Sequence, residues 1–272
     1  GARVVMEHCD VEGPAPEVGA PVRINSLLEG NQESPQVGML PGGGAVFAWE
    51  GGASGFHRVH YRVANAQGVF LADDLLATGP ESGEQTEPSL AVLKNGNSVL
   101  AWTDYLADGS VKGVSARIIG ANGQAVADPF RLNKFTLGNQ HKSRLTALPG
   151  GGFAAVWVSD QQQDAKSLDV VARVFSATGQ ALSAEVVVNA PGISANPSVA
   201  IAGKSLVVAW EQLNLKQKKH RWDIGARSFD LNLKPLSEPV LANTHLVGDQ
   251  FAPQLRGGAE GAMLVWNSLG QD

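Results

Sequence analysis

A tryptophan recurs along this chain at a nearly constant spacing, each time at the end of a short apolar run. The intervals between successive copies are 53, 55, 53 and 56 residues. The five copies are Trp49, Trp102, Trp157, Trp210 and Trp266. A period of this length indicates a repeat architecture, in which each unit buries its apolar face against its neighbours.

Each repeat contains two predicted β-hairpins. A Gly-rich turn, such as residues 41–44, separates the Trp strand from an earlier strand that begins at or near a proline in four of the five repeats. A second hairpin follows, and its first strand carries Arg62, Arg117, Arg173 or Arg227. Four antiparallel strands per repeat, here called a to d in chain order, form the blade of a β-propeller.

The two ends of the sequence match complementary halves of this repeat. Residues 3–25 resemble the second hairpin, and residues 248–272 resemble the first. The sequence therefore predicts an all-β fold, a single five-bladed β-propeller with a last blade closed by two strands from each end. Such closure removes exposed sheet edges. The predicted blades span residues 26–78, 79–133, 134–189, 190–243, and 244–272 together with 1–25.

The repeated large side chains are predicted to be structural. A tryptophan can fill the wedge between two neighbouring blades, and a ring buried there has no free face for a sugar. Trp222 lies outside the repeat register and is expected to be more exposed. The repeated arginines are expected to pair with carboxylates of strand d. Those carboxylates belong to Asp73, Asp128, Glu185 and Glu238.

The loops that join strands b and c vary in length, whereas the d–a loops share the signature Gly-x-Gln-x-x-Pro. Because function usually lies on variable loops of a rigid scaffold, we expect binding on the face that carries both loop sets. The signature glutamines either form a ring around the channel mouth or cap the loop backbone. The candidate ligand-binding residues are Gln32, Gln85, Gln140, Gln250, Tyr105, His220 and Trp222.

Composition excludes several classes of protein. A net charge of −5 and a single basic run, residues 216–221, do not supply the broad basic face that nucleic acid requires. The lone Cys9 excludes an internal disulfide and a cysteine metal cluster. No apolar run is long enough to cross a bilayer. Without a recognisable signal peptide, the chain is expected to be either cytosolic or a processed exported product.

A glycoside hydrolase is the catalytic alternative, and it requires two acids at a controlled separation. The predicted innermost strands contain no acid. Glu33 and Glu87, expected just outside those strands, and the loop residue Asp104 are the remaining candidates. We therefore assign no catalytic residue and expect a protein that is not an enzyme. His57 and His60 are expected to be exposed and have no evident third metal ligand.

Two b–c loops contain acids that leave calcium open as an alternative. The four residues are Asp104, Asp108, Asp160 and Asp164. Calcium takes six to eight oxygen ligands, and each loop offers only two carboxylates. The sequence therefore predicts no metal and no other cofactor.

The order of motifs supports a family resemblance. A Gly-x-Gln-x-x-Pro segment (30–35), a Leu-Pro-Gly-Gly-Gly turn (40–44), an apolar run ending in Trp (45–49) and an Arg strand follow one another. This order resembles the tandem repeats of large bacterial secreted and surface proteins. The resemblance implies an extracytoplasmic binding or scaffolding module that contacts protein or glycan. The predicted blade number is also that of tachylectin-type lectins, but the divergent b–c loops favour a protein-interaction scaffold.

Overall fold

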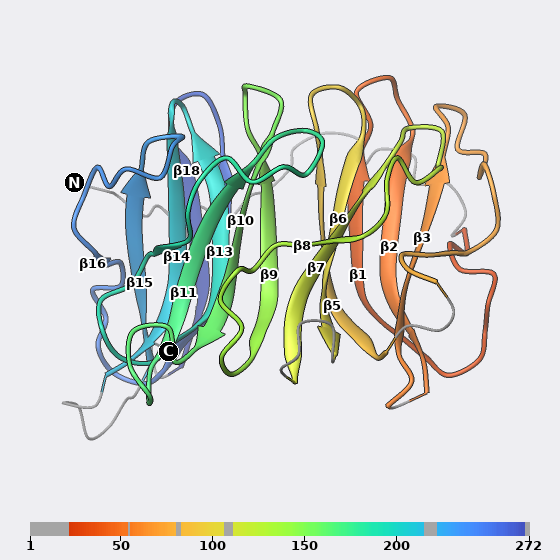
Figure 1. Cartoon of the computed structure of the whole chain (residues 1–272). Coiled ribbons are helices and arrows are strands. Elements are labelled where there is room, and N and C mark those ends of the chain that lie inside the picture. Colours follow the sequence, from red (N-terminus) through yellow and green to blue (C-terminus); the bar gives the residue numbers. More distant parts are fainter. Residues whose placement is uncertain (1–21, 54, 80–82, 106–110, 215–221, 270–272) are drawn as a thin grey trace.

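The computed structural model describes residues 22–53, 55–79, 83–105, 111–214 and 222–269. These residues form 18 strands, arranged as four four-stranded antiparallel sheets and one two-stranded sheet (Figure 1). The sheets are the blades of a five-bladed β-propeller, which confirms the predicted fold class. None of the described residues belongs to a helix that could span a membrane.

Each blade follows the order a to d from the channel outwards. Blade 1 contains β1 (Asn31–Met39), β2 (Ala45–Gly52), β3 (Arg58–Ala64) and β4 (Leu75–Leu76). Blade 2 contains β5 (Gln85–Val92), β6 (Ser98–Tyr105), β7 (Lys112–Ile119) and β8 (Phe130–Arg131). Blade 3 contains β9 (Gln140–Ala147), β10 (Phe153–Asp160), β11 (Leu168–Phe175) and β12 (Val186–Val187). Blade 4 contains β13 (Ser194–Ala202), β14 (Ser205–Leu213), β15 (Trp222–Phe229) and β16 (Val240–Leu241), and blade 5 contains β17 (Gln250–Gly257) and β18 (Ala262–Ser268).

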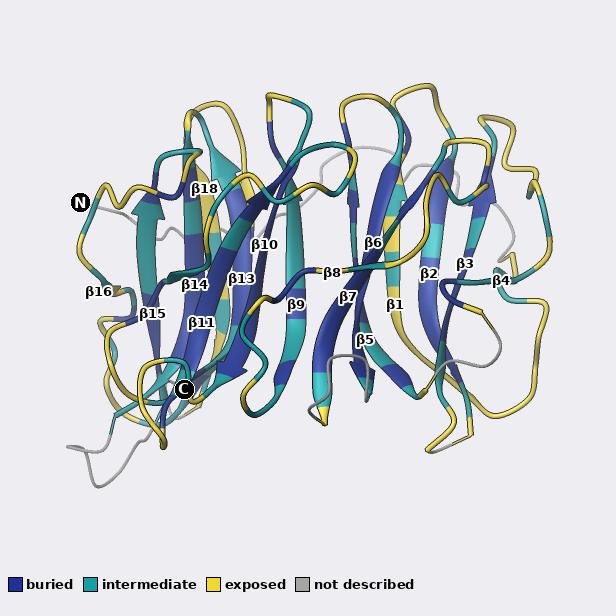
Figure 2. Cartoon of the chain, in the orientation of Figure 1, coloured by how far each residue is buried: buried dark blue, intermediate teal, exposed yellow. Residues whose placement is uncertain are grey.

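The innermost strands pack against one another in chain order, β1 on β5, β5 on β9, β9 on β13 and β13 on β17. The a–b turns lie at the top of Figure 1 and the described b–c loops lie at the bottom. Strands b and c of blades 2 to 4 carry most of the buried residues, whereas β1 and β18 are largely exposed (Figure 2). The amino-terminal hairpin expected to complete blade 5 lies outside the described residues.

The repeated tryptophans fill the wedges between blades. Trp102, Trp157 and Trp210 are each at most 1% exposed. Each ring packs against the preceding blade, as Trp102 does with Val59 and Tyr61 of β3. Apolar contact between neighbouring sheets therefore holds the described ring together.

The repeated arginines connect neighbouring blades through backbone carbonyls. The Nη1 atom of each arginine donates a hydrogen bond to a backbone carbonyl, which for Arg117, Arg173 and Arg227 directly follows strand d of the preceding blade. The acceptors are Ile24 for Arg62 (2.5 Å), Ala77 for Arg117 (3.0 Å), Leu132 for Arg173 (2.9 Å) and Val188 for Arg227 (3.2 Å). Each Nε atom donates to a carbonyl of its own blade, as Arg173 does to Ser183 at 3.1 Å.

Two of the four predicted arginine–carboxylate pairs form among the described residues, Arg62 with Asp73 and Arg227 with Glu238. Arg62 Nε also lies 3.7 Å from the buried Asp74 carboxylate. Asp73 and Glu238 lie 3.9 Å from their arginines and are almost fully exposed. The Glu185 carboxylate instead accepts the backbone N–H groups of Lys134 and Phe135. The arginines bind these carbonyls because strand d is only two residues long. Its end leaves buried backbone acceptors that need hydrogen-bond donors.

Replacing one of these arginines should destabilise the ring. We expect Arg173→Gln to lower the free energy of unfolding by about 1–3 kcal/mol, because two carbonyls lose a charged donor. Lys204→Gln, on an exposed turn, is the control and should change it by less than about 0.5 kcal/mol. Urea denaturation measures both values, and equal changes would contradict the connecting role of Arg173.

Candidate binding site at the mouth of the central channel

One residue of every innermost strand has a left-handed backbone. The φ angles are 52° at Ser34, 56° at Glu87, 55° at Lys142, 45° at Asn196 and 54° at Ala252. Each residue lies at a β-bulge, where the pairing with strand b shifts register. Residues other than glycine seldom adopt this conformation, and such strain is concentrated at functional sites. The repeat therefore fixes one backbone geometry around the channel mouth, while the side chain differs in every blade.

Acceptors on strand b of the preceding blade hold several of these backbones in place. The residue after the repeated tryptophan supplies the acceptor. Glu50 Oε2 accepts the Glu87 N–H at 2.9 Å, and Glu211 Oε1 accepts the Ala252 N–H at 2.7 Å. In blade 2 the equivalent residue is Thr103, whose hydroxyl lies 3.1 Å from the Lys142 nitrogen. Glu50 and Glu211 are buried, so they serve first to stabilise the bulges.

The side chains of the left-handed residues continue this network across blades 2 to 4. Glu87 Oε2 accepts hydrogen bonds from the Thr103 hydroxyl at 2.7 Å and from the Lys142 N–H at 3.1 Å. The Lys142 ammonium donates to Asn196 Oδ1 at 2.8 Å. The Asn196 amide in turn donates to Glu211 Oε2 at 2.8 Å. We call Glu87, Thr103, Lys142, Asn196 and Glu211 the polar belt, which offers a carboxylate, an ammonium group and an amide at one rim.

The two acids expected outside the innermost strands lie within them. Glu33 belongs to β1 and Glu87 to β5, so that part of the prediction is wrong. The bulge at the left-handed residue lets each strand continue pairing on its far side. Glu33 is exposed, whereas Glu87 is half-buried in the polar belt.

The histidines of blade 1 are not exposed, contrary to the sequence prediction. His57 Nδ1 lies 3.3 Å from Glu50 Oε1 and 3.6 Å from Glu84 Oε1, and its Nε2 atom is buried without a hydrogen-bond partner among the described residues. His60 stacks on Trp49, with ring centroids 5.8 Å apart. Burial lowers the pKa of His60, which the charge of Asp74 only partly offsets.

The signature glutamines face their loops. Gln85, Gln140 and Gln250 have no exposed side-chain surface, while Gln32 is exposed. Gln140 donates to the Leu137 carbonyl at 3.0 Å and accepts from the Asn133 amide at 3.1 Å. The geometry corresponds to the capping alternative, since three of the four amides are inaccessible to a ligand.

The other candidate contact residues are not members of the polar belt or lie outside the described residues. Tyr105 is half-buried, and the Lys112 ammonium lies 4.8 Å from the centroid of its ring. Trp222 is half-buried, and its N–H donates to Asp249 Oδ1 at 3.1 Å. His220 lies outside the described residues.

The acids considered for calcium have protein partners, and Asp104 and Asp160 lie at the ends of β6 and β10, not in loops. Asp104 Oδ2 accepts the Trp102 indole N–H at 3.1 Å, and Asp160 accepts the Asn139 amide at 2.9 Å. Asp164 accepts the Lys166 N–H at 2.8 Å. Asp108 lies outside the described residues. Within the described ranges, no three His, Cys, Asp or Glu side chains gather in a group that could hold a metal ion.

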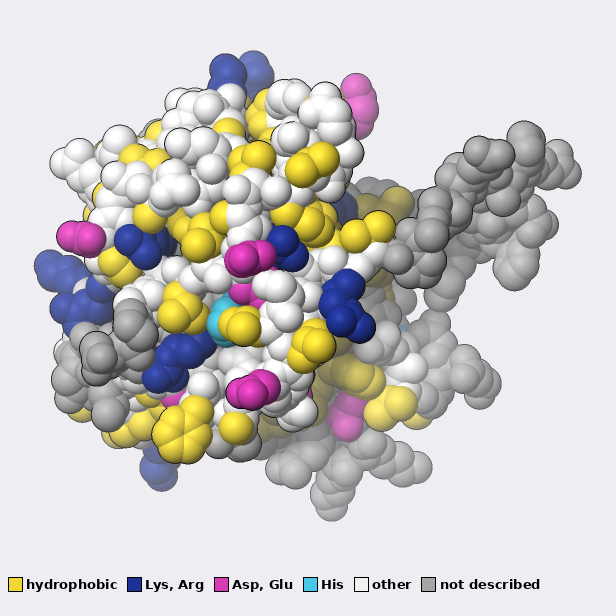
Figure 3. Space-filling model, turned by 90° about the vertical axis from the view of Figure 1, so that its right-hand side faces the viewer, with side chains coloured by type: hydrophobic (Ala, Val, Ile, Leu, Met, Phe, Trp, Pro, Cys, Tyr) yellow, Lys and Arg dark blue, Asp and Glu magenta, His cyan; other side chains and the backbone are white. Residues whose placement is uncertain are grey.

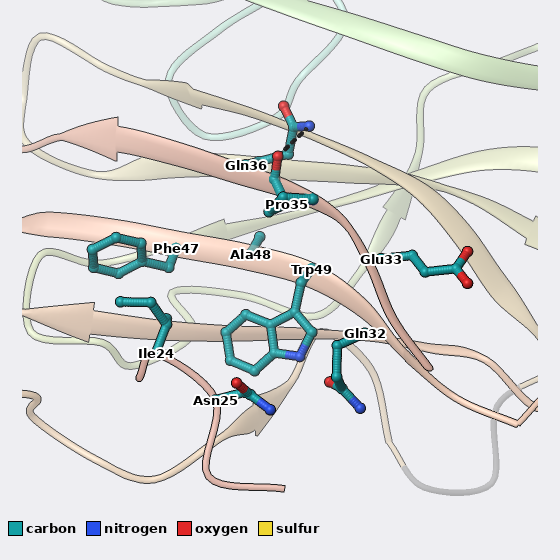
Figure 4. A pocket seen from close by; sticks show the side chains of 9 residues that line it. All are labelled: Ile24, Asn25, Gln32, Glu33, Pro35, Gln36, Phe47, Ala48 and Trp49. Carbon is teal, nitrogen blue, oxygen red and sulfur yellow. Dashed lines mark hydrogen bonds between the residues drawn. The ribbon is translucent and has the colours of Figure 1, made fainter. Parts of the chain in front are cut away.

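Two hollows lie away from the polar belt. A cavity of about 150 Å³ beside Trp49 is open on the side of blade 1 that faces blade 5. Figure 4 shows Ile24 and Asn25 next to the Trp49 ring, with the Glu33 carboxylate pointing away from it. A wider apolar hollow of about 530 Å³ lies at the a–b turn end of the channel, where Met39 and Ile201 are among its lining residues.

Figure 3 shows the side of the molecule that lies at the right of Figure 1. Among the described residues of this face, lysine and arginine side chains are separated by acidic, apolar and neutral ones.

The comparisons with known proteins support the fold. No protein family and no curated protein matches the chain. An α-L-arabinanase from Penicillium chrysogenum, solved with arabinobiose, has a TM-score of 0.62 and 15% identity over 89% of this chain and 79% of its own. An α-L-arabinofuranosidase from Fusarium graminearum, solved with an iminosugar inhibitor, has a TM-score of 0.62 and 12% identity, covering 86% of this chain and 74% of its own. A protein of unknown function from Dyadobacter fermentans has a TM-score of 0.60 and 13% identity, covering 82% of this chain and 71% of its own.

Proposed function

We propose that this chain binds a glycan at the mouth of its central channel and does not cleave it. The observation that carries the proposal is the ring of left-handed residues, which have one backbone geometry and five different side chains. A scaffold that repeats its backbone and varies its side chains can be matched to one ligand. The extracytoplasmic location and a protein partner remain predictions from the sequence.

The chemistry of the polar belt suits sugar hydroxyl groups. A hydroxyl group both donates and accepts hydrogen bonds, so it needs both kinds of partner. The Glu87 carboxylate accepts, the Lys142 ammonium donates, and the Asn196 amide does both. The Phe251 ring, next to Ala252 in β17, is half-buried and adds apolar surface near the same rim.

The way the acids of the polar belt are used supports a non-catalytic role. Hydrolysis of a glycosidic bond requires two carboxyl groups on opposite sides of that bond. Glu50 and Glu211 are buried and bind backbone N–H groups of the next blade. Glu87 is the acid of the polar belt that projects from an innermost strand, and it has no second free carboxylate opposite it among the described belt residues.

A glycoside hydrolase is the second candidate, because the fold resembles that of two arabinan-related enzymes solved with sugar-like ligands. The same Glu87 would then be its best acid. A Glu87→Gln variant separates the two functions. The variant should leave oligosaccharide turnover at the background level of the wild-type protein, whereas turnover that disappears with Glu87 would establish the hydrolase instead.

Binding is tested on an array of neutral and acidic oligosaccharides, with calorimetry for the positive members. We expect Lys142→Ala to weaken binding at least about tenfold, which corresponds to about 1.4 kcal/mol. Lys234→Ala is the matched control, because Lys234 is exposed in the c–d turn of blade 4 at the other end of the molecule. Binding that is equally strong in both variants would place the ligand elsewhere.

A further inference from the structure

The innermost strand of blade 3 departs from the repeat at the channel mouth. Lys142 and Arg144 lie two residues apart on β9, and Ser143 between them replaces the proline of the other blades. The equivalents of these two cations in the other four blades are neutral or acidic. They are Ser34, Glu87, Asn196 and Ala252 for Lys142, and Gln36, Ser89, Ser198 and Gln254 for Arg144.

The serine that replaces the shared proline in blade 3 has a buried hydrogen-bond partner. Ser143 is fully buried, and its hydroxyl lies 3.1 Å from the Ser89 hydroxyl on the neighbouring innermost strand. A proline would need no such partner. In a repeat protein, a blade that breaks the shared pattern without gaining apolar packing is a candidate for a function that belongs to that blade alone.

Arg144 is a half-buried cation with few protein partners. Its one hydrogen bond among the described residues runs from Nη1 to the carbonyl of the adjacent Ser143, at 2.9 Å. A guanidinium group carries five N–H donors, and no carboxylate of the described chain forms an ion pair with it. Burial lowers the pKa of Arg144, and the charge of Glu87 opposes that effect. An arginine stays charged in proteins, so the remaining N–H donors of Arg144 are available to an anionic partner.

The repeat register indicates which way Arg144 faces. The Ser89 hydroxyl at the equivalent position of blade 2 meets the next innermost strand, and the Ser198 hydroxyl of blade 4 accepts the Leu255 N–H at 2.9 Å. By the same register we infer that Arg144 faces β13. The Lys142 ammonium also reaches β13, where it binds Asn196. Both cations thus lie on the β9–β13 side of the mouth.

We propose that this side of the mouth binds the carboxylate of an acidic saccharide, a uronate. Arg144 forms the paired N–H contacts for which a guanidinium is suited, and Lys142 adds a second positive charge. A singly charged carboxylate fits better than a phosphate polymer, because Glu87 and Glu50 lie at the same mouth and the whole chain carries a net charge of −5. The inference rests on the proposed glycan binding and adds its ligand class.

The test compares matched oligosaccharides that differ only in oxidation at C6, namely galactose, glucose and mannose disaccharides and their uronates. We expect the wild-type protein to prefer at least one uronate to its neutral partner by tenfold or more. Arg144→Gln should remove that preference and leave neutral binding within about twofold. Arg144→Lys, which keeps the charge but loses the planar fork, should retain part of the preference.

Arg256→Gln is the matched control. Arg256 also lies on an innermost strand and makes the same contact with the preceding carbonyl, Leu255, at 2.9 Å, but it is exposed. It should keep the uronate preference, and thermal unfolding should show that every variant is folded. Neutral binding without a uronate preference, or a preference that survives in Arg144→Gln, would overturn this inference alone. No binding to any of the saccharides would overturn the proposed function as well.

Discussion

Oxidation of an Ala262→Cys variant is expected to form a disulfide between the introduced cysteine and Cys9 within one chain. The expectation starts from the open seam between blades 5 and 1. In the described part of the chain, β18 pairs only with β17, and Met263 and Val265 are 71% and 53% exposed. The equivalent Val46 and Ala48 of blade 1 are each 1% exposed. Apolar residues that are buried in a complete blade are therefore uncovered at this seam.

The other wall of the seam shows the same feature. Val37 and Met39 of β1 are 64% and 71% exposed, whereas Val199 and Leu255, which are equivalent to Val37, are buried. Exposed apolar surface on both sides of one gap indicates that a further segment packs there.

The described residues nearest the amino terminus indicate which segment fits. Arg62 donates to the Ile24 carbonyl, as Arg173 donates to Leu132 at the end of a complete strand d. Asp74 accepts the N–H groups of Ser26 at 2.9 Å and Leu27 at 2.8 Å. Burial alone would raise the pKa of Asp74, but these N–H groups and Arg62 more than offset it, so its pKa is lowered.

The register of the repeat then pairs specific residues. Arg62 lies opposite Phe47, two residues before Trp49, and Arg173 lies opposite Ala155 in the same relation to Trp157. Glu7 takes the arginine position in the sequence. The same register places it opposite Leu264 and places Cys9 opposite Ala262. The residues before position 22 lie outside the described chain, so the pairing is a prediction.

The cross-link is measured on non-reducing gels, by thiol titration and by peptide mapping. Residues directly opposite in antiparallel strands have Cα atoms about 4.5–5.5 Å apart, within the range that a disulfide spans. The bond should raise the free energy of unfolding by about 2–4 kcal/mol. Met263→Cys is the control, because its side chain points to the other face of β18. A disulfide-linked dimer would indicate that a second chain completes blade 5. Failure of the cysteines to form any disulfide would contradict the predicted closure of blade 5 by the amino-terminal segment.

The blade count was predictable because the tryptophans at positions 49, 102, 157, 210 and 266 record it directly in the sequence. Packing between two blades needs one large side chain at each interface. The tryptophan therefore recurs even where the rest of the repeat varies. The capping role of the glutamines was among the alternatives for a similar reason. A residue that recurs in most blades serves a contact that most blades make, as Gln140 does with Leu137.

The polar belt was not predicted, because its residues lie where the repeat is not conserved within the chain. Lys142 and Asn196 precede the position of the shared proline, and Glu211 follows a repeated tryptophan. The variation at these positions is visible in the sequence, but the left-handed backbone that brings them to one rim is not. The carbonyl partners of the arginines were not predicted for a related reason. Every residue has a backbone carbonyl, so an acceptor such as that of Leu132 cannot be recognised from the amino-acid type.

Loss of one wedge tryptophan should remove a large part of the stability of the ring. Trp157 is fully buried between blades 2 and 3, where it contacts the apolar cluster that includes Val114 and Leu132. We expect Trp157→Ala to lower the free energy of unfolding by about 3–5 kcal/mol, against the total of about 5–15 kcal/mol of an ordinary domain. Neither blade can collapse into the cavity, because each is held by its other neighbour.

Trp222→Ala is the control for this loss, because Trp222 is half-buried and lies outside the repeated register. It should cost no more than about 1 kcal/mol. Urea denaturation followed by circular dichroism measures both values without depending on tryptophan fluorescence. If the two losses were equal, tryptophan content rather than the wedge position would set the stability. That result would contradict the role of the five regularly spaced tryptophans in holding the blades together.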